Sequence, residues 1–254
     1  MLSIIIPALN EEKYLPILLS SIKKQNLNDF EIIISDAGSS DKTVEIAKNY
    51  NCKIVKGGLP GIGRNRGAKA AQGNLLLFLD ADVLLPKDFF EKSLKELKER
   101  KLNMASFKLV PKENKFAIIF FDIFYNFPII ILEKILPHAA MGILIEKEFF
   151  YKLNGFDETI KLAEDNDLAR RARKIGKFGI IRSTKIFISL RRFQKDGWLV
   201  TCLKYFFGEL YMIFLGPIRT DIFNYRFNHY LENKKEQIII NNKIIKNKNN
   251  KEDI

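Results

Sequence analysis

The first hundred residues alternate between strand-like and helix-like runs, and this alternation constrains the fold more than any other feature of the sequence. The strand-like runs are short and rich in β-branched or other apolar residues, which is typical of buried strands. Strands and helices that alternate with short connections form a parallel sheet with helices on both faces. The sequence therefore predicts an α/β fold with a mostly parallel central sheet. Strands are predicted at 2–6, 30–35, 52–55 and 75–79, and helices at 11–24, from Asp41 onward, at 61–72 and at 86–101.

Polar residues follow three of these strands directly, in the segments 7–11, 36–41 and 80–82. Ligands of parallel α/β sheets bind beyond the carboxyl ends of the strands. There Asp36 can accept hydrogen bonds from a ribose or from the N–H of a base, or it can simply close a turn. We expect Asp36 to contact a ligand, and Asp41 to cap the helix that follows.

Asp80 and Asp82 form an Asp-X-Asp pair after the apolar strand at 75–79. Alternation along an extended chain sends both side chains the same way. Two carboxylates so close to each other raise each other's pKa unless a cation compensates their charges. A hard divalent ion whose shell is completed by phosphate oxygens is one solution, and a turn or helix cap is the plain alternative. The position at the end of a central strand favours the metal site.

The chain carries 42 basic and 30 acidic residues, a net charge of +12. Such an excess favours anionic partners, namely nucleic acid, a phosphorylated substrate or acidic lipid. The two cysteines cannot form a disulfide framework and supply too few ligands for a structural zinc site. No basic region precedes the apolar run at 4–6, so we expect no signal peptide and a location in the cytoplasm or on the cytosolic face of a membrane.

Two apolar, aromatic segments, 117–136 and 198–218, mark the second half of the chain. Charged residues interrupt both, so neither is a clean membrane-spanning helix. They are predicted either to lie on a membrane surface or to pack as ordinary buried helices. Residues 170–204, which include the start of the second segment, hold eleven Lys or Arg and one acid. The tail at 233–254 is polar and basic, and we expect it to be loosely ordered.

Four segments of the sequence resemble family 2 glycosyltransferases, and they occur in the order found in that family. They are SIIIPALNEE, IIISDAGSSDKT, GIGRNRGAKAAQGNLLLFLDAD and GFDETIKLAEDNDLARRARKIG. Each motif is weak by itself, but the ordered set is specific and covers about residues 1–195. The resemblance implies a GT-A fold and an inverting enzyme that uses a nucleotide-diphosphate sugar.

The resemblance also implies roles for single residues at the donor site. Asp82 matches the direct ligand of Mg or Mn, and Asp80 leans toward the ribose or a metal-bound water. Asp36 matches the carboxylate that reads the base, although Ala37 stands where many relatives carry a second Asp. The other nucleotide contacts implied are Pro7, Ala8, Leu9, Glu11, Arg64 and Asn65.

Glu164 and Asp165 precede a predicted basic helix at 168–174, where acids are favoured by the helix dipole. Inversion at an anomeric carbon needs a carboxylate to take the proton of the acceptor. The family supplies that base from this motif, which implies Asp165 as the general base and Glu164 as a residue that orients the acceptor. Asp167 is expected to pair with a nearby arginine.

Arg191 and Arg192 belong to a basic run that resembles the mobile segment folded over the diphosphate in many relatives. Cationic side chains there stabilise the charge of the leaving group. A solvated basic face or a phospholipid-binding patch is an equal alternative. Trp198 is expected to stack on a sugar or to lie at a membrane interface, and His138 is expected to be structural.

Together these features predict sugar transfer from a nucleotide-diphosphate sugar, with inversion and a divalent metal. The acceptor is expected to be a hydroxyl or phosphate, on a lipid-linked or cell-envelope glycan, with an anionic membrane surface as a further partner. Residues 1–190 are expected to form the catalytic domain, 191–232 a basic, aromatic helical segment, and 233–254 the tail.

Three other functions remain open at this stage. A relative that binds a nucleotide sugar or serves as a membrane scaffold without turnover would keep the same motifs. A sugar-phosphate nucleotidyltransferase shares the architecture. It requires a Gly-rich phosphate-binding loop directly after the first strand, however, and residues 7–12 contain no glycine. A nucleic-acid binder fits the charge, but the chain has no recognisable reading motif, so no specific nucleic acid is expected.

Overall fold

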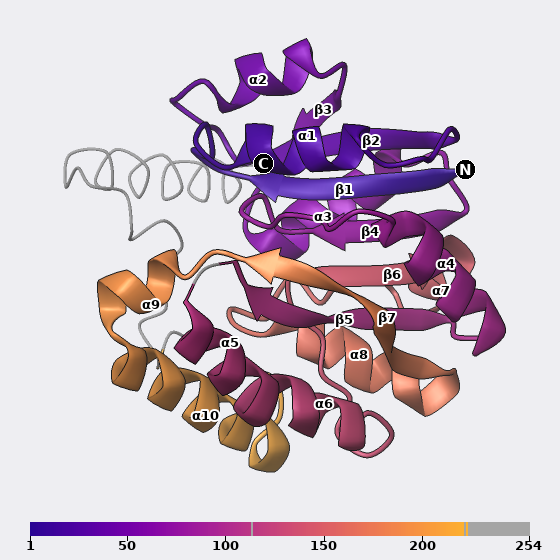
Figure 1. Cartoon of the computed structure of the whole chain (residues 1–254). Helices are drawn as coiled ribbons and strands as arrows, with labels where there is room; N and C mark the ends of the chain where they lie inside the picture. The colour runs from indigo at the N-terminus through magenta and orange to yellow at the C-terminus, as the bar shows by residue number, and fades with distance from the viewer. Residues whose placement is uncertain (113, 221, 223–254) are drawn as a thin grey trace, which may run out of the picture.

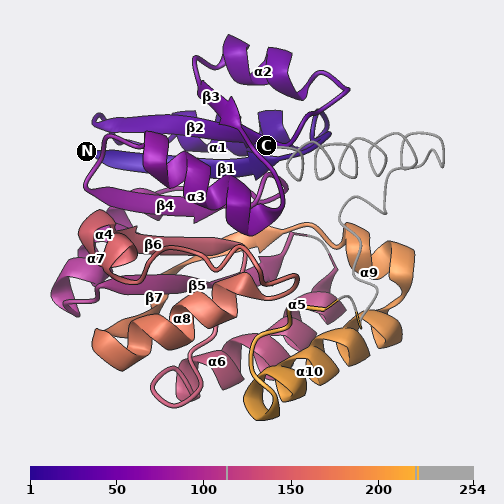
Figure 2. The ribbon, with the colours of Figure 1, turned by 180° about the vertical axis from the view of Figure 1, so that it is seen from behind.

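The computed structural model describes residues 1–112, 114–220 and 222, and within them helices cover both faces of a seven-stranded sheet (Figures 1 and 2). The predicted tail at 233–254 lies outside the described residues. The strands are β1 (Leu2–Ala8), β2 (Phe30–Asp36), β3 (Lys53–Lys56), β4 (Leu75–Leu79), β5 (Met104–Pro111), β6 (Gly142–Glu146) and β7 (Phe178–Ile188). Their order in the sheet is β3-β2-β1-β4-β6-β5-β7.

Neighbouring strands run parallel except at β6, which is antiparallel to both β4 and β5. The predicted mostly parallel sheet is therefore confirmed. The helices are α1 (Leu15–Lys23), α2 (Thr43–Asn49), α3 (Pro60–Ala70), α4 (Phe89–Glu99), α5 (Lys115–Phe121), the π-helical turn η1 (Asp122–Asn126), α6 (Phe127–Ile131), α7 (Lys147–Lys152), α8 (Glu164–Ile175), α9 (Arg191–Asp196) and α10 (Trp198–Phe214).

The apolar core lies on both sides of the sheet because successive side chains of a strand point to opposite faces. On β1, Ile4 and Ile6 pack into a cluster with residues of α1 and α4, whereas Ile5 packs into a second cluster with residues of α3, α7 and α8. A strand buried on both faces must be apolar throughout, which explains the uninterrupted run at 4–6.

Several predicted boundaries need correction. The first helix begins at Leu15 instead of residue 11, because residues 11–14 form a turn in which the Glu11 carbonyl accepts the N–H of Tyr14. Asp41 is not the N-cap of α2, a position that Lys42 holds. Its carboxylate accepts the Thr43 N–H at 2.9 Å and the Glu12 N–H at 3.0 Å, so it joins two loops.

The helix predicted at 86–101 begins only at Phe89, since Asp88 adopts a left-handed conformation (φ 59°). The helix predicted at 168–174 begins at Glu164, so the acidic pair lies inside its first turn. The segment 117–136 is helical only as far as Ile131, and a π-helical turn lies within this helical run, between α5 and α6.

The second half presents an apolar face to solvent, formed by α5, η1, α6 and α10. These helices lie side by side below β5 and β7 in both views (Figures 1 and 2). None of the described helices is long and apolar enough to cross a bilayer. The two segments are also not fully buried helices, since the exposed side chains of this apolar face include Phe116, Ile119, Ile123, Phe124, Phe127, Ile131, Leu199, Leu203, Phe206, Phe207 and Phe214.

Candidate functional site

One large cavity of about 1710 Å³ opens at the carboxyl ends of the central strands and extends to the inner sides of α6 and α10. It collects residues that lie far apart in the sequence. Every predicted site residue lines it except Asn65 and Trp198; those that do are Pro7, Ala8, Leu9, Glu11, Asp36, Arg64, Asp80, Asp82, Glu164, Asp165, Arg191 and Arg192.

Asn65 and Trp198 have contacts elsewhere. The Asn65 side chain accepts the N–H of Phe156 and donates to its carbonyl, both at 2.9 Å, so it holds the loop before α8. The Trp198 ring packs on Phe193 at 4.7 Å and on Phe120 at 5.5 Å between ring centroids. It therefore joins α10 to α9 and α5.

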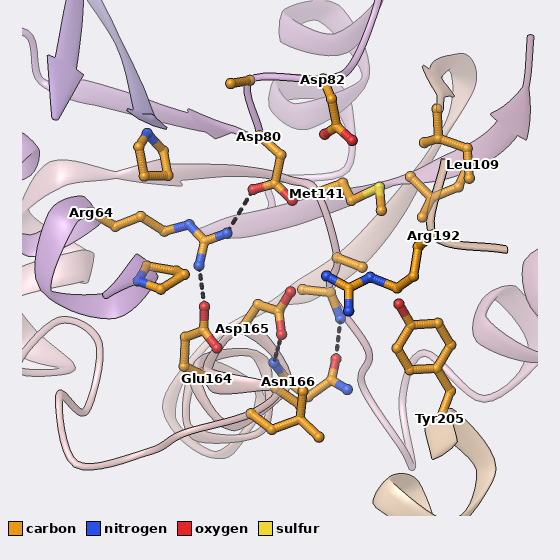
Figure 3. A pocket seen from close by; sticks show the side chains of 18 of the residues that line it. Arg64, Asp80, Asp82, Leu109, Met141, Glu164, Asp165, Asn166, Arg192 and Tyr205 are labelled. Atoms are coloured by element: carbon orange, nitrogen blue, oxygen red, sulfur yellow. Dashed lines mark hydrogen bonds and ion pairs between the residues drawn. The ribbon is translucent and has the colours of Figure 1, made fainter. Parts of the chain in front are cut away.

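Arg64 forms the charged centre of the cavity (Figure 3). Arg64 is only 5% exposed, and its guanidinium donates hydrogen bonds to Asp80, at 2.8 Å, and to Glu164. It reaches them because α3 packs very closely on the sheet: a Cβ added at Gly67 would collide with Ile5. Gly67 thus allows close packing of α3 on β1, and one arginine of this helix joins β4 to α8.

Asp165 points into the middle of the cavity from the first turn of α8 (Figure 3). Burial, with help from the charge of Glu164, raises the pKa of the Asp165 carboxyl to about 8, against the lowering effect of Arg64. The carboxylate accepts the Asn166 N–H at 3.0 Å, and the Asn166 side chain accepts the Ala139 N–H at 3.0 Å. These two hydrogen bonds hold the first turn of α8 in place beside the cavity.

Arg191 lies on the opposite side of the cavity from Arg64, near the carboxyl ends of the strands. It forms two hydrogen bonds with Glu11, at 2.9 and 2.7 Å, and an ion pair with Asp82 at 2.9 Å. Its guanidinium also lies 4.6 Å from the centre of the Tyr14 ring. Burial raises the pKa of Asp82, and Arg191 opposes that shift. Two residues predicted to bind nucleotide or metal are thus joined by this arginine.

Asp36 lies at the cavity edge but also closes its own turn. Its carboxylate accepts the N–H of Gly38 at 3.0 Å and the N–H of Ser39 at 3.1 Å. Gly38 has a positive φ of 95°, which glycine adopts without strain. The turn and the ligand contact weighed for Asp36 can therefore coexist.

Asp80 and Asp82 are the residues in the cavity suited to a hard cation. Among the described residues, no group of three or more His, Cys, Asp or Glu side chains could enclose a metal ion. Two carboxylates fit the way Mg²⁺ is commonly held, by one or two protein oxygens together with substrate phosphates and water. The donor set thus fits a cation shared with a ligand.

The sequence analysis missed a polar group at the far end of the cavity. Glu209 of α10 pairs with Arg170 at 2.7 Å, and its other carboxylate oxygen lies 3.8 Å from Nδ1 of His138. Burial lowers the pKa of His138. The detectable signal was Glu209 itself, a charge that interrupts an apolar helix. Tyr125 and Tyr205 line the same end, and in an aromatic segment nothing set them apart.

Comparison with known proteins places the chain in a family. The profile of Glycosyl transferase family 2 matches residues 3–145. Poly(ribitol-phosphate) beta-N-acetylglucosaminyltransferase TarS of Staphylococcus aureus is 35% identical over 96 residues, which are 34% of this chain and 17% of TarS. An uncharacterized glycosyltransferase of Haemophilus influenzae is 31% identical over 179 residues, 66% of this chain and 60% of that protein. The chain thus spans less than two thirds of the length of either relative.

Solved structures agree on the fold. TarS 1–349 in complex with UDP-GlcNAc superposes with a TM-score of 0.59 at 19% identity, over 93% of this chain and 77% of that chain. The mannosyltransferase PcManGT from Pyrobaculum calidifontis, in complex with GDP-Man and Mn²⁺, superposes with a TM-score of 0.69 at 16% identity, over 86% of this chain and 65% of that chain. These neighbours have the predicted GT-A fold. Because the family profile covers more than half of the chain, the protein belongs to glycosyl transferase family 2.

Proposed function

We propose that the protein is an inverting glycosyltransferase that moves a sugar from a nucleotide-diphosphate sugar to an acceptor. The observation that carries this proposal is that a single cavity holds both the Asp80/Asp82 pair and Asp165. The first can hold a diphosphate through a cation, and the second can take a proton from a nucleophile. A binding module would need only the first.

The donor is proposed to lie along the carboxyl ends of β1, β2 and β4. Pro7, Ala8, Leu9 and Asp36 line the cavity there and would contact the nucleoside. Arg191 and Arg192 would face the diphosphate and stabilise its charge as the bond to the sugar breaks. Both nucleotides held by the structural neighbours, UDP-GlcNAc and GDP-Man, carry this diphosphate group.

Asp82 and Asp80 are proposed to hold a divalent ion, Mn or Mg, together with diphosphate oxygens. When bound, such an ion neutralises charge that develops on the leaving group. Arg191 now pairs with Asp82, so this arginine must release or share the carboxylate. Its positive charge keeps the acidic site compensated until the donor arrives.

Asp165 is proposed to act as the general base. In its ionised form it takes the proton of the acceptor hydroxyl while the acceptor oxygen bonds to the anomeric carbon. The bond from that carbon to the diphosphate oxygen breaks on the opposite face, which inverts the configuration. Glu164, held by Arg64, would orient the acceptor beside it.

The donor site is testable by thermal shift against UDP, GDP, CDP and dTDP, each with and without Mn²⁺. We expect one nucleotide to raise the Tm in a metal-dependent manner, because a ligand that binds only the folded state stabilises it by mass action. The Asp82→Asn variant should lose the metal dependence. No shift with any nucleotide contradicts the donor site, and a shift without hydrolysis or transfer of the matching sugar supports a non-catalytic binding protein instead.

The acceptor is proposed to be lipid-linked or part of a cell-envelope glycan, reached at the cytosolic face of a membrane. The apolar face supports this, and exposed lysines stand at its edges: Lys115 begins α5, Lys134 follows α6 and Lys195 precedes α10. Apolar side chains flanked by basic ones bind anionic bilayers.

Membrane binding is testable by co-sedimentation with vesicles of phosphatidylglycerol and phosphatidylcholine. We expect the protein to sediment with anionic vesicles and to be released by salt. The double variant Ile123→Ser, Phe127→Ser should bind less, because it removes two exposed side chains of the apolar face. Ile17→Ser changes another exposed isoleucine, on α1 and outside the apolar face, and should have no effect. A protein that stays in the supernatant would exclude the membrane proposal.

A further inference from the structure

The cavity is larger than one ligand requires. Its volume of about 1710 Å³ exceeds the roughly 300–1,000 Å³ of a typical small-molecule site. The donor end accounts for the polar lining near the strands. The other end lies between η1 and α6 on one side and α10 on the other, and its apolar lining includes Phe121, Ile129 and Met212.

A single polar atom stands out in this apolar end. The hydroxyl of Tyr125 is buried, and among the described residues it has no hydrogen-bond partner. The Tyr125 ring is held edge-on against His138, at 5.3 Å between centroids, and packs near Phe121 at 5.9 Å. A buried hydroxyl without a partner costs free energy, so its retention points to a ligand that pairs with it.

The backbone beneath Tyr125 is held in place. Tyr125 lies on the π-helical turn η1, and such turns are frequent at functional sites. The next residue, Asn126, donates to the carbonyl of Leu109 and accepts its N–H, both at 2.9 Å, so the turn is tied to β5. These bonds leave the tyrosine ring facing the cavity.

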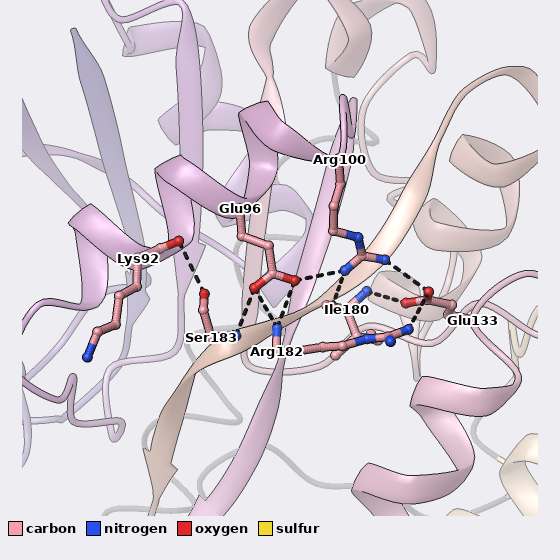
Figure 4. A network of polar contacts seen from close by, with 7 residues as sticks. All are labelled: Lys92, Glu96, Arg100, Glu133, Ile180, Arg182 and Ser183. Atoms are coloured by element: carbon pink, nitrogen blue, oxygen red, sulfur yellow. Dashed lines mark hydrogen bonds and ion pairs between the residues drawn. The ribbon is translucent and has the colours of Figure 1, made fainter.

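The far end of the helical run α5–η1–α6 is anchored as well (Figure 4). Glu133, which follows α6, is buried and accepts hydrogen bonds from Arg100 at 2.9 Å, from Arg182 at 2.8 Å and from the Ile180 N–H at 2.8 Å. The wall that carries Tyr125 is therefore fixed to the sheet at both ends, as a preorganised binding site requires.

We propose that Tyr125 and Asp165 together bind the acceptor's hydroxyl group, and that the acceptor is an amphiphilic alcohol whose hydrocarbon part lies between η1–α6 and α10. This inference rests on the proposed function, since it gives Asp165 its acceptor. The alcohol hydrogen points to Asp165, one oxygen lone pair accepts the Tyr125 O–H, and the second lone pair is free to attack the sugar. Each group is used once, and no polar atom is left unpaired.

The electrostatics favour an alcohol over a phosphate. Burial, with smaller contributions from Asp165, Tyr205 and Glu209, raises the pKa of the Tyr125 hydroxyl well above the ordinary value, so it stays a hydrogen-bond donor. An ionised phosphate oxygen needs no base to remove a proton, which would leave Asp165 without a role.

The apolar lining continues to the surface. Phe124 and Phe206 both line the cavity and belong to the exposed apolar face. In this proposal a hydrocarbon chain enters beside these two side chains and reaches Tyr125 along the apolar lining. The apolar face and the inner site are then two parts of a single acceptor path.

The inference is tested by calorimetric titration with n-octyl β-glucoside, methyl β-glucoside and n-octyl phosphate, all below micelle-forming concentrations. We expect octyl glucoside to bind at least tenfold more tightly than methyl glucoside and more tightly than octyl phosphate. Tyr125→Phe should weaken octyl glucoside binding by roughly three- to tenfold, the usual range for one hydrogen bond. Tyr151→Phe is the matched control, because its hydroxyl bonds the Ala68 carbonyl outside the cavity.

The outcomes are distinct from those of the donor test. Tyr125→Phe should keep the full metal-dependent nucleotide shift, so a lost shift would indicate damage to the whole site. Equal binding of octyl glucoside by Tyr125→Phe and Tyr151→Phe overturns the role of Tyr125. Tighter binding of octyl phosphate overturns the alcohol assignment, and no octyl glucoside binding to the unaltered protein overturns the amphiphile.

Discussion

The Asp165→Asn variant is expected to lose transfer activity by about 10²–10⁴-fold while gaining thermal stability at neutral pH. The loss follows because an amide cannot take the proton of the acceptor. The gain follows because burial and the neighbouring Glu164 make a charge at this position unfavourable. Asn keeps a side-chain oxygen that can accept the Asn166 N–H, so the geometry of the first turn of α8 is retained.

The stability gain has a defined pH dependence. The pKa of Asp165 is about 8 in the folded protein against an ordinary value of 3.8. Between these values the folded state binds more protons than the unfolded state, so the stability that Asp165 contributes is present below about pH 4 and is lost as the pH rises toward 8. Asn does not titrate. The Tm difference between Asp165→Asn and the unaltered protein should therefore be near zero at pH 4 and largest at pH 8.

Asp167→Asn provides the matched control. Asp167 lies two residues along the same helix and pairs with Arg171 at 2.7 Å. Its substitution should slightly lower the Tm and leave transfer activity unchanged. Melting curves across this pH range and a donor-turnover assay decide the matter. An active Asp165→Asn variant would place the base elsewhere, and an Asp165→Asn Tm below that of Asp167→Asn would contradict the buried-charge argument.

The fold was predictable because it depends on local periodicity. The apolar run at 75–79 is β4 from end to end, and the sheet follows from strands that alternate with helices. The polar cluster at the strand ends was predictable for the same reason, because in a parallel sheet the residues that follow the strands, such as Asp36 and Asp80, meet at one edge.

The ion pairs of the site were not predictable, because they join residues that no local pattern connects. Arg64 and Glu164 are 100 positions apart, and Arg191 and Glu11 are 180 apart. Arg191 was assigned to the diphosphate from its basic run alone. Its contact with Glu11 and Asp82 depends on how the chain that leaves β7 and enters α9 runs past the ends of the central strands.

The far end of the cavity was hidden for a different reason. Tyr125 lies in an aromatic segment, where a tyrosine has the same pattern as a core residue. The π-helical turn that carries it shifts the helical register, and the residue lines the cavity. A single inserted residue per turn leaves no periodic signal strong enough to detect in so short a segment.

The Arg64→Met variant is expected to be the most destabilising change in the site, at roughly 3–5 kcal/mol near pH 8, the usual loss when one partner of a buried ion pair is removed. Arg64 neutralises both Asp80 and Glu164, and the Glu164 side chain is only 11% exposed. Without the guanidinium, the carboxylates of Asp80, Glu164 and Asp165 remain close together and have lost the cation that neutralised them. Urea unfolding measures the loss.

The exposed pair of Arg219 and Asp157 provides the comparison, because Arg219→Met should cost no more than about 1 kcal/mol. The Arg64→Met loss should also shrink at pH 5. Unpaired buried carboxyls have raised pKa values, so the folded state gains protons and recovers stability as the pH falls. Adding Glu164→Gln should restore part of the stability at pH 8, since it removes one of the stranded charges. Equal losses in Arg64→Met and Arg219→Met, or a loss that is the same at both pH values, would show that Arg64 does not hold the charges of this site together.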